Sequence, residues 1–221
     1  MSGTIEVICG PMFSGKTEEL IRRLKRAVIA RRKVQVFKPR ADSRYDPEAL
    51  VSHSQLKMLS TVVEKPEDIL QKLAQDVEVV GIDEVQFLGP GILPVVKNLA
   101  DRGLRVVVAG LDQDYRGMPF EPMPQLLAEA EYITKELAIC VVCGQPAGRS
   151  QRIITEERAL PATGGGREAG ASEAAERPDG RVQVGAGDAY EARCRKDFSP
   201  EPRPATSPAQ QELLPFFRNE G

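Results

Sequence analysis

The stretch Gly10-Pro11-Met12-Phe13-Ser14-Gly15-Lys16-Thr17 matches the pattern G-x-x-x-x-G-K-[ST] at every position. An apolar segment, Thr4 to Cys9, precedes it, and Glu18 to Leu24 reads as the first turns of a helix. Strand, glycine turn and helix in this order distinguish a phosphate-binding loop (P-loop) from a chance glycine-rich turn. Backbone N–H groups and the positive end of the helix dipole bind anions at such a loop. The sequence therefore predicts a nucleoside triphosphate site formed by these eight residues.

Lys16 and Thr17 have predicted roles within the loop. The Lys16 ammonium is expected to reach the β- and γ-phosphate oxygens, and the Thr17 hydroxyl to help hold Mg²⁺. A second part of the phosphate machinery is the acidic pair Asp83-Glu84, which follows the apolar segment Val79 to Ile82. Asp83 at a strand end is expected to bind the Mg²⁺ shell, whereas an acidic pair without a P-loop would more simply be a solvated loop.

Glu84 decides between two kinds of chemistry. A carboxylate beside the Mg²⁺ aspartate can accept a proton from the group that attacks the γ-phosphate. If the attacking group is water, the protein is an ATPase; if it is a bound hydroxyl, the protein is a kinase. A kinase also needs an acceptor pocket and a lid that excludes water.

Composition limits the other possibilities. The chain has 221 residues, 41% of them hydrophobic, which allows one domain with or without a small appendage. Its formal charge is −2, from 30 basic and 32 acidic residues, and favours neither nucleic acid nor an anionic membrane as partner. It has no apolar run of membrane-spanning length and no signal-peptide pattern, so a soluble cytoplasmic protein is expected. His53 is the only histidine, which excludes multi-histidine metal sites.

Strand and helix patterns alternate over the first 137 residues. The strand candidates are Ile5 to Cys9, Val34 to Lys38, Val77 to Ile82, Leu104 to Leu111 and Tyr132 to Leu137. The helix candidates are Glu18 to Arg32, Pro66 to Gln75, Gly91 to Arg102 and Pro124 to Ala130. Alternation of this kind predicts an α/β fold with a doubly wound, mostly parallel, RecA-like sheet that binds ligands at the carboxyl ends of its strands.

The first helix carries a basic face opposite its apolar stripe. Its members are Arg22, Arg23, Lys25, Arg26, Arg31 and Arg32. A solvated helix face is favoured over a nucleic-acid patch, because the net charge is near zero and no aromatic residues are interleaved.

Beyond Glu136 the composition changes. Two β-like segments, Arg152 to Ile154 and Arg181 to Val184, flank Ala159 to Gly180, which has almost nothing to bury and is expected to be disordered. Residues from Ser199 onward are expected to form a flexible tail. The predicted organisation is a nucleotide-binding domain at 1–137, a small lid domain at 138–198 and a tail at 199–221.

The cysteines of the lid domain suggest a metal site. Cys140 and Cys143 form a C-x-x-C pair, Cys194 follows, and Asp197 stands where a fourth cysteine would complete a Cys₄ site. Zinc accepts carboxylate oxygen, so structural zinc held by three cysteines and Asp197 is chemically possible; the alternatives are an empty site or a fourth ligand from water or another side chain. Cys9 is most simply a core residue. Zinc would cross-link a domain that is too small to form a stable hydrophobic core of its own.

Taken together, these motifs resemble the thymidine kinases of the cellular, zinc-containing type. The resemblance rests on 10–17, on Ile82 to Phe87, on Asp42-Ser43-Arg44-Tyr45, on Leu111-Asp112 with Pro119-Phe120, on Arg149 to Arg152, and on Gly187 to Tyr190 leading into Cys194. It runs in order from residue 3 to about 198 and leaves out the Ala159 to Gly180 insertion and the tail. Asp197 departs from the family pattern.

The resemblance implies transfer of the ATP γ-phosphoryl to the 5′-hydroxyl of thymidine or deoxyuridine, with Glu84 as general base. It places Asp42, Arg44, Asp83 and Gln86 with the P-loop around ATP and Mg²⁺. It also implies a base pocket walled by Met12, Phe87, Leu111 and Phe120, with Ser150 nearby, although each of these apolar residues could instead be plain core. A lasso-like lid would close over the nucleoside with Val182, Val184, Gly185 and Tyr190. The family also implies a homotetramer.

Two other classes of protein share parts of this pattern. A RecA-like ATPase that acts with nucleic acid has the P-loop and the acidic pair, but the near-neutral charge argues against it. A non-catalytic nucleotide-binding module held by zinc would have no use for Glu84. A thymidine kinase is therefore the predicted function.

Overall fold

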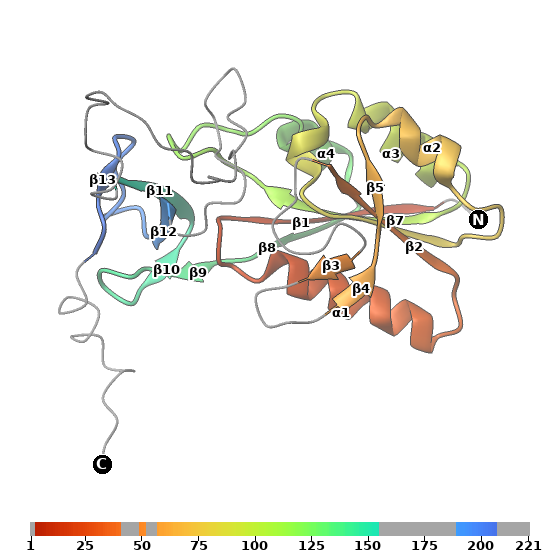
Figure 1. Ribbon diagram of the computed structural model, residues 1–221, viewed down its shortest axis with the longest axis horizontal. Coiled ribbons are helices and arrows are strands. Elements are labelled where there is room, and N and C mark those ends of the chain that lie inside the picture. Colours follow the sequence, from red (N-terminus) through yellow and green to blue (C-terminus); the bar gives the residue numbers. More distant parts are fainter. Residues whose placement is uncertain (1–2, 41–48, 52–56, 155–188, 207–221) are drawn as a thin grey trace, which may run out of the picture.

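A six-stranded parallel sheet dominates the computed structural model, which describes residues 3–40, 49–51, 57–154 and 189–206 (Figure 1). Its strand order is β5-β2-β6-β7-β1-β8, and every neighbouring pair is parallel. The strands are β1 (Thr4–Gly10), β2 (Val34–Pro39), β5 (Thr61–Val63), β6 (Val79–Ile82), β7 (Arg105–Leu111) and β8 (Tyr132–Lys135). The predicted α/β class is confirmed. The edge strand β5 was not predicted, because three residues are too few to show a pattern.

Helices cover both faces of the sheet, as Figure 1 shows. They are α1 (Lys16–Ile29), α2 (Glu67–Lys72), α3 (Ile92–Asp101) and α4 (Met123–Glu129), with a 3₁₀ turn η1 (Val85–Leu88) after β6. Helix α1 packs on one face and buries Leu20, Ile21, Leu24 and Ala27, a spacing that gives one apolar stripe. The other three helices pack on the opposite face in a second, larger core.

The sheet order brings the ends of separate strands together. Strands β6 and β7 lie between β1 and β2 in the sheet. The chain that leaves β1 therefore crosses two strand positions before it forms β2. Gly10 is level with Leu111 in the register, and Ile82 ends β6 on the same edge. Parallel strands end at one edge, so the segments that follow β1, β6 and β7 form one rim, where ligands bind in such folds.

An ion-pair network ties α1 to the sheet. Arg23 donates to Glu6 and Glu19, and Arg105 donates to Glu6 from the neighbouring strand. Burial alone raises the pKa of Glu6, but the hydrogen bonds and charges of Arg105 and Arg23 outweigh it, and the net pKa is lowered. Arg22, by contrast, is 58% exposed. The predicted basic face therefore has two parts: Arg22 is exposed to solvent, whereas Arg23 is largely buried and ion-paired with Glu6 and Glu19.

A smaller β unit follows β8. It contains β9 (Ala138–Ile139), β10 (Pro146–Ala147), β11 (Arg149–Ile154), β12 (Tyr190–Arg193) and β13 (Arg203–Pro204). In Figure 1 it lies to one side of the sheet. Its core cluster is made of Ala138, Cys140, Ala147, Ala192 and Cys194, with Val142 against it. Alanine and cysteine side chains bury little apolar area, and small modules with such cores are commonly stabilised by a further cross-link.

The segment 199–206 differs from the flexible tail expected there. Gln151 is fully buried, accepts from the Ser199 amide at 2.8 Å and donates to the Glu201 carbonyl at 2.9 Å. Thr206 donates from its own amide to Glu191 at 2.7 Å. A proline- and serine-rich segment is expected to be disordered when no neighbour hydrogen-bonds to its backbone groups. Here side chains of β11 and β12 provide those hydrogen bonds.

Several predicted features lie outside the described residues: the insertion at 159–180, the segment 181–184, His53 and the chain beyond residue 206. Within the described residues, β11 pairs with β12 in antiparallel fashion. A short antiparallel pair, β3 (Ala49–Val51) with β4 (Lys57–Leu59), was not predicted. The part of the chain that the structure describes contains no helix long and apolar enough to cross a membrane.

Candidate active site

The loop at 10–17 has a left-handed or otherwise positive φ at both of its glycines. Gly10 has a φ of 145° and Gly15 a φ of 84°. A side chain on Gly10 would begin 2.2 Å from the backbone oxygen of Glu136, far inside van der Waals contact. Phe13 also has a positive φ, 64°, and is 41% exposed. The loop is thus packed tightly against the chain that leaves β8, and its tip is open.

Lys16 is held in the mouth of the loop. Its ammonium donates to the Pro11 carbonyl at 2.5 Å, and the Ser14 hydroxyl donates to the same oxygen at 2.9 Å. Lys16 is 9% exposed and begins α1, whose N-terminal cap is Gly15, a residue without a side chain to satisfy the first-turn N–H groups. A buried cation beside a helix N-terminus is the electrostatic setting that a triphosphate requires.

Thr17, in the first turn of α1, meets Asp83, which directly follows β6. The Thr17 hydroxyl donates to Asp83 Oδ2 at 3.0 Å, and Asp83 is 3% exposed. The Asp83 amide donates to the Phe37 carbonyl at 3.0 Å, which fixes the carboxylate at the end of β6. A hydroxyl and a carboxylate oxygen are hard donors of the kind that Mg²⁺ takes alongside waters and phosphates, so these two residues fit the ion.

Glu84 stands in a strained backbone conformation. Its φ of 46° and ψ of 41° lie in the left-handed region, which is uncommon for glutamate and is maintained where the surroundings fix it. Gln86 is fully buried and supplies that support, since its amide nitrogen donates to Glu84 Oε2 at 2.5 Å. The Gln86 carbonyl oxygen accepts from the Leu111 amide at 3.1 Å. The motif after β6 thus joins Glu84 to the end of β7.

The four apolar residues expected to wall a pocket form a cluster of their own. Phe87, Leu111 and Phe120 are buried together with Met12 against them, separate from both sheet cores. The Phe87 and Phe120 rings meet edge to face, 6.4 Å between centroids and 83° between planes. Plain core residues would merge with one of the large clusters; a separate cluster at the ligand-binding rim suits a small apolar ligand better.

Ser150 joins the small β unit to this rim. The Ser150 hydroxyl accepts a hydrogen bond from the Met12 amide at 3.0 Å, and Ser150 is 5% exposed. Tyr190, at the start of β12, is buried, with 4% of its surface exposed. The remaining predicted site residues, Asp42, Arg44, Val182, Val184 and Gly185, lie outside the described residues.

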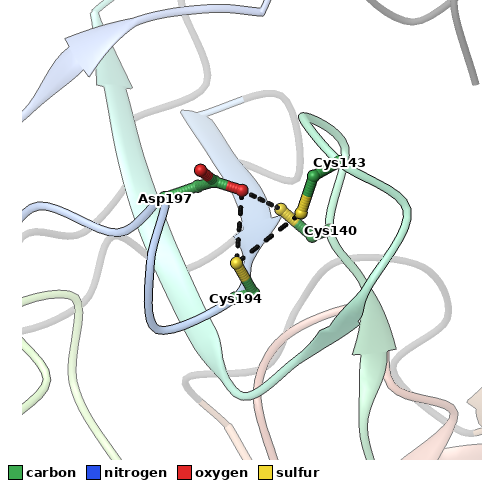
Figure 2. A group of neighbouring side chains, drawn as sticks. All are labelled: Cys140, Cys143, Cys194 and Asp197. Atoms are coloured by element: carbon green, nitrogen blue, oxygen red, sulfur yellow. Dashed lines mark hydrogen bonds between the residues drawn. The ribbon is translucent and has the colours of Figure 1, made fainter.

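Three cysteines and Asp197 converge at the base of the small unit (Figure 2). Cys140 and Cys143 come from the turn after β9, and Cys194 from the end of β12. The ligand atoms all lie within 4.8 Å of one another. The Cys143 and Cys194 sulfurs are 3.7 Å apart, and Asp197 Oδ2 lies 3.3 Å from Cys140 Sγ and 3.2 Å from Cys194 Sγ.

These separations fit a tetrahedral zinc ion. Sulfurs bound at about 2.3 Å to one tetrahedral ion lie roughly 3.8 Å apart, close to the spacing observed. The thiols of Cys143, Cys194 and Cys140 donate to Asp197 and lower the pKa of that carboxyl, so it is ready to act as an anionic ligand. The four predicted ligands, three cysteines and Asp197, therefore lie close enough together to hold one zinc ion.

No role was predicted for an ion pair beside the loop, in which a buried aspartate meets an exposed lysine. Asp112 follows β7, is 8% exposed and lies 2.6 Å from Lys135 Nζ on β8. Strand β1 runs between these two strands, so the pair spans the start of the P-loop. The two charged residues stand at the ends of β7 and β8, and this position becomes informative only once the strand order is known.

This fold and this loop define a P-loop nucleotide-binding protein with a small cysteine-bearing β unit. The family profile described as "Thymidine kinase" matches residues 3–198. The chain belongs to the thymidine kinase family.

Two relatives and one solved structure are similar to it. The thymidine kinase of Rhodothermus sp. is 51% identical over 213 residues, 96% of this chain and 89% of that protein. The thymidine kinase of Bdellovibrio bacteriovorus is 51% identical over 199 residues, 90% and 87% of the two chains. Domain III of the Thermotoga maritima replication initiation protein DnaA has 18% identity, a TM-score of 0.35 and coverage of 60% of this chain and 54% of that one, a likeness that carries no argument.

Proposed function

We propose that this protein transfers the γ-phosphoryl group of ATP to the 5′-hydroxyl of thymidine or deoxyuridine. The observation that carries the proposal is the Gln86 link, which joins the Glu84 carboxylate to the apolar cluster around Leu111. An ATPase needs the carboxylate but no such cluster beside it. A kinase for a small, partly apolar acceptor needs both.

The phosphate side of the reaction uses the P-loop. Amides of 10–17 bind the triphosphate, and Lys16 neutralises charge that builds up on the transferred group. Mg²⁺, held by Thr17 and Asp83, would supply further positive charge to the phosphate oxygens. Asp42 and Arg44 are proposed to lie near the donor phosphates, as the family resemblance implies.

Glu84 is proposed as the general base. The nucleoside O5′ attacks the γ-phosphorus, and the bond from that phosphorus to the β–γ bridging oxygen breaks, which leaves ADP. The proton of the attacking hydroxyl passes to the Glu84 carboxylate. Gln86 holds Glu84 through one oxygen, which orients the other toward the acceptor.

The acceptor side uses the pocket cluster and the small β unit. Met12, Phe87, Leu111 and Phe120 would contact the base, with Tyr190 over the sugar and base and Ser150 near the pocket. Val182, Val184 and Gly185 would close over the nucleoside as a lid. Closure would exclude water and so favour the bound hydroxyl as attacking group.

Structural zinc at Cys140, Cys143, Cys194 and Asp197 is proposed to hold the small unit together. The separations described above support it, and so does the lack of large apolar side chains in that unit's core. Domains at 1–137 and 138–198 are proposed on the same basis. A cytoplasmic homotetramer without nucleic-acid or membrane partners stays an expectation from composition and family.

One assay tests the proposed activity against its rivals. The protein is incubated with γ-labelled ATP, Mg²⁺ and, in turn, no acceptor, each of the common nucleosides, or DNA. The proposal expects labelled 5′-monophosphate with thymidine and deoxyuridine. Phosphate release that DNA stimulates and thymidine does not affect would support a RecA-like ATPase instead, and ATP binding without any transfer would support a non-catalytic module.

A further inference from the structure

A short hairpin connects the pocket cluster to the metal cluster. The segment Asp112–Phe120 folds back on itself: the Phe120 amide donates to the Asp112 carbonyl at 3.0 Å, and the Asp114 amide donates to the Met118 carbonyl at 2.9 Å. Asp114 also accepts from the amides of Arg116 and Met118, at 2.9 and 3.0 Å. The hairpin is therefore internally braced, and its base lies at Leu111 and Phe120, two walls of the pocket cluster.

The tip of this hairpin touches the residue next to a metal ligand. Gly117, with a φ of 77°, lies so close to Phe198 that a side chain on it would begin 3.2 Å from the Phe198 ring. Phe198 directly follows Asp197, and the Arg149 guanidinium lies 5.9 Å from the centre of its ring. The ring is thus held between the hairpin tip and β11.

A second contact joins the hairpin to the small unit independently. The Tyr115 ring is 9% exposed, and the Arg152 guanidinium of β11 lies 5.3 Å from its centre. Arg152 pairs in register with Tyr190 on β12, the strand that leads to Cys194. The first contact therefore reaches the residue that follows Asp197, and the second reaches β11, which pairs with the strand that leads to Cys194.

We propose that the Asp112–Phe120 hairpin couples the metal cluster to nucleoside binding, with Phe198 as the positioning residue at its tip. This inference rests on the proposed function. A metal ion fixes Asp197 and with it the Phe198 ring, the ring fixes the hairpin tip, and the braced hairpin carries that restraint to Leu111 and Phe120. Coupling between two sites is reciprocal, so bound thymidine must also raise the affinity for zinc.

The reciprocal effect gives a test that does not depend on turnover. Zinc affinity is measured on the full chain by equilibrium competition with a chromogenic chelator, with and without saturating thymidine. For the unsubstituted protein the expected increase with thymidine is about fivefold or more, the lower end of ordinary coupling. Phe198→Ala is expected to reduce it to within about twofold, while Phe198→Tyr keeps the ring and the increase. Tyr132→Ala, an aromatic residue 58% exposed on β8, is the matched control.

Kinetics supply the second measurement. Phe198→Ala should raise the KM for thymidine by about three- to tenfold, the effect of losing one aromatic contact, and leave the KM for ATP unchanged within about twofold. General damage to the fold would move both. If Phe198→Ala no longer holds zinc on purification, Tyr115→Leu takes its place in both measurements, because Tyr115 is remote in sequence from the ligands.

The outcomes separate this inference from the proposed function. If the unsubstituted protein neither binds nor phosphorylates thymidine, the proposed function fails. If thymidine is phosphorylated but does not change zinc affinity, or if Phe198→Ala and Tyr115→Leu keep the full increase, the hairpin coupling is wrong and the kinase stands.

Discussion

The side-chain amide nitrogen of Gln86 donates a hydrogen bond of 2.5 Å to the Glu84 carboxylate. The other end of the same amide accepts from the Leu111 amide, so one buried side chain braces the acidic residue and a wall of the pocket cluster. Gly110 makes room for it, since a side chain there would begin 2.6 Å from Gln86 Oε1. The glutamine two residues after Glu84 thus has a defined structural role in this site.

Replacing Gln86 should therefore reduce catalysis through the position of the Glu84 carboxylate. We expect Gln86→Leu to lower kcat by about 10²-fold, because a carboxylate displaced by about 1 Å loses its alignment with the acceptor. The matched control is Gln35→Leu, which also removes a glutamine that bonds to backbone groups, of Lys72 and Ala74, away from the site. A folded Gln86→Leu variant with unchanged kcat would remove Gln86 from the positioning of Glu84.

Substitution of Glu84 itself tests the proposed base. Glu84→Gln keeps the shape but cannot take a proton, so phosphoryl transfer should fall by about 10²–10⁴-fold. Binding of a fluorescent ATP analogue should persist, because Lys16, Thr17 and Asp83 are untouched. Glu64→Gln, at a carboxylate whose side chain is 66% exposed, serves as control. Near-normal turnover by Glu84→Gln would exclude this residue as the base.

The fourth ligand of the metal cluster can be tested by metal analysis. Removal of a group that merely orients a ligand typically costs about 10–100-fold in metal affinity, and loss of the Asp197 carboxylate in Asp197→Ala should cost at least as much. Asp197→Cys should raise zinc affinity above that of the unsubstituted protein, since a thiolate is the softer donor. Equal zinc affinity of Asp197→Ala and the unsubstituted protein would show that the carboxylate is not a ligand.

Glu19 gives a prediction about pH. Its hydrogen bonds with Arg22 and Arg23 lower the pKa of Glu19 from 4.5 to about 2. A carboxyl with a lowered folded-state pKa stabilises the fold above its unfolded pKa, and the contribution disappears as the pH falls through the folded value. We expect Glu19→Gln to cost about 1 kcal/mol at pH 7, a modest value because solvent screens the pair, and almost nothing near pH 2.

Urea unfolding at pH 7, 4 and 2 measures this difference. Glu18→Gln, one residue earlier in the same helix turn, controls for the loss of a negative charge near the helix N-terminus. A stability difference for Glu19→Gln that is as large at pH 2 as at pH 7 would contradict the role of the ion pairs.

The local patterns of the chain were enough to predict the nucleotide side of the site. A P-loop can be identified from eight consecutive residues, because its function depends on the local backbone conformation and on a helix that begins within the motif. The roles of Asp83 and Glu84 could be predicted for a similar reason, because the acidic pair directly follows a continuous apolar segment. The C-x-x-C pair predicted a metal cluster, and Asp197 was included as the residue at the expected spacing.

Contacts between distant residues were decided only by the tertiary structure. Ser150 accepts from Met12 across 138 positions, the Gly117 tip meets Phe198, and Asp112 meets Lys135 over β1. The segment 199–206 is ordered by Gln151 and Glu191, although its composition suggests a tail. A short pattern records the propensity of adjacent residues, whereas these pairings depend on strand order and on which buried polar groups are left to be satisfied once the sheet has formed.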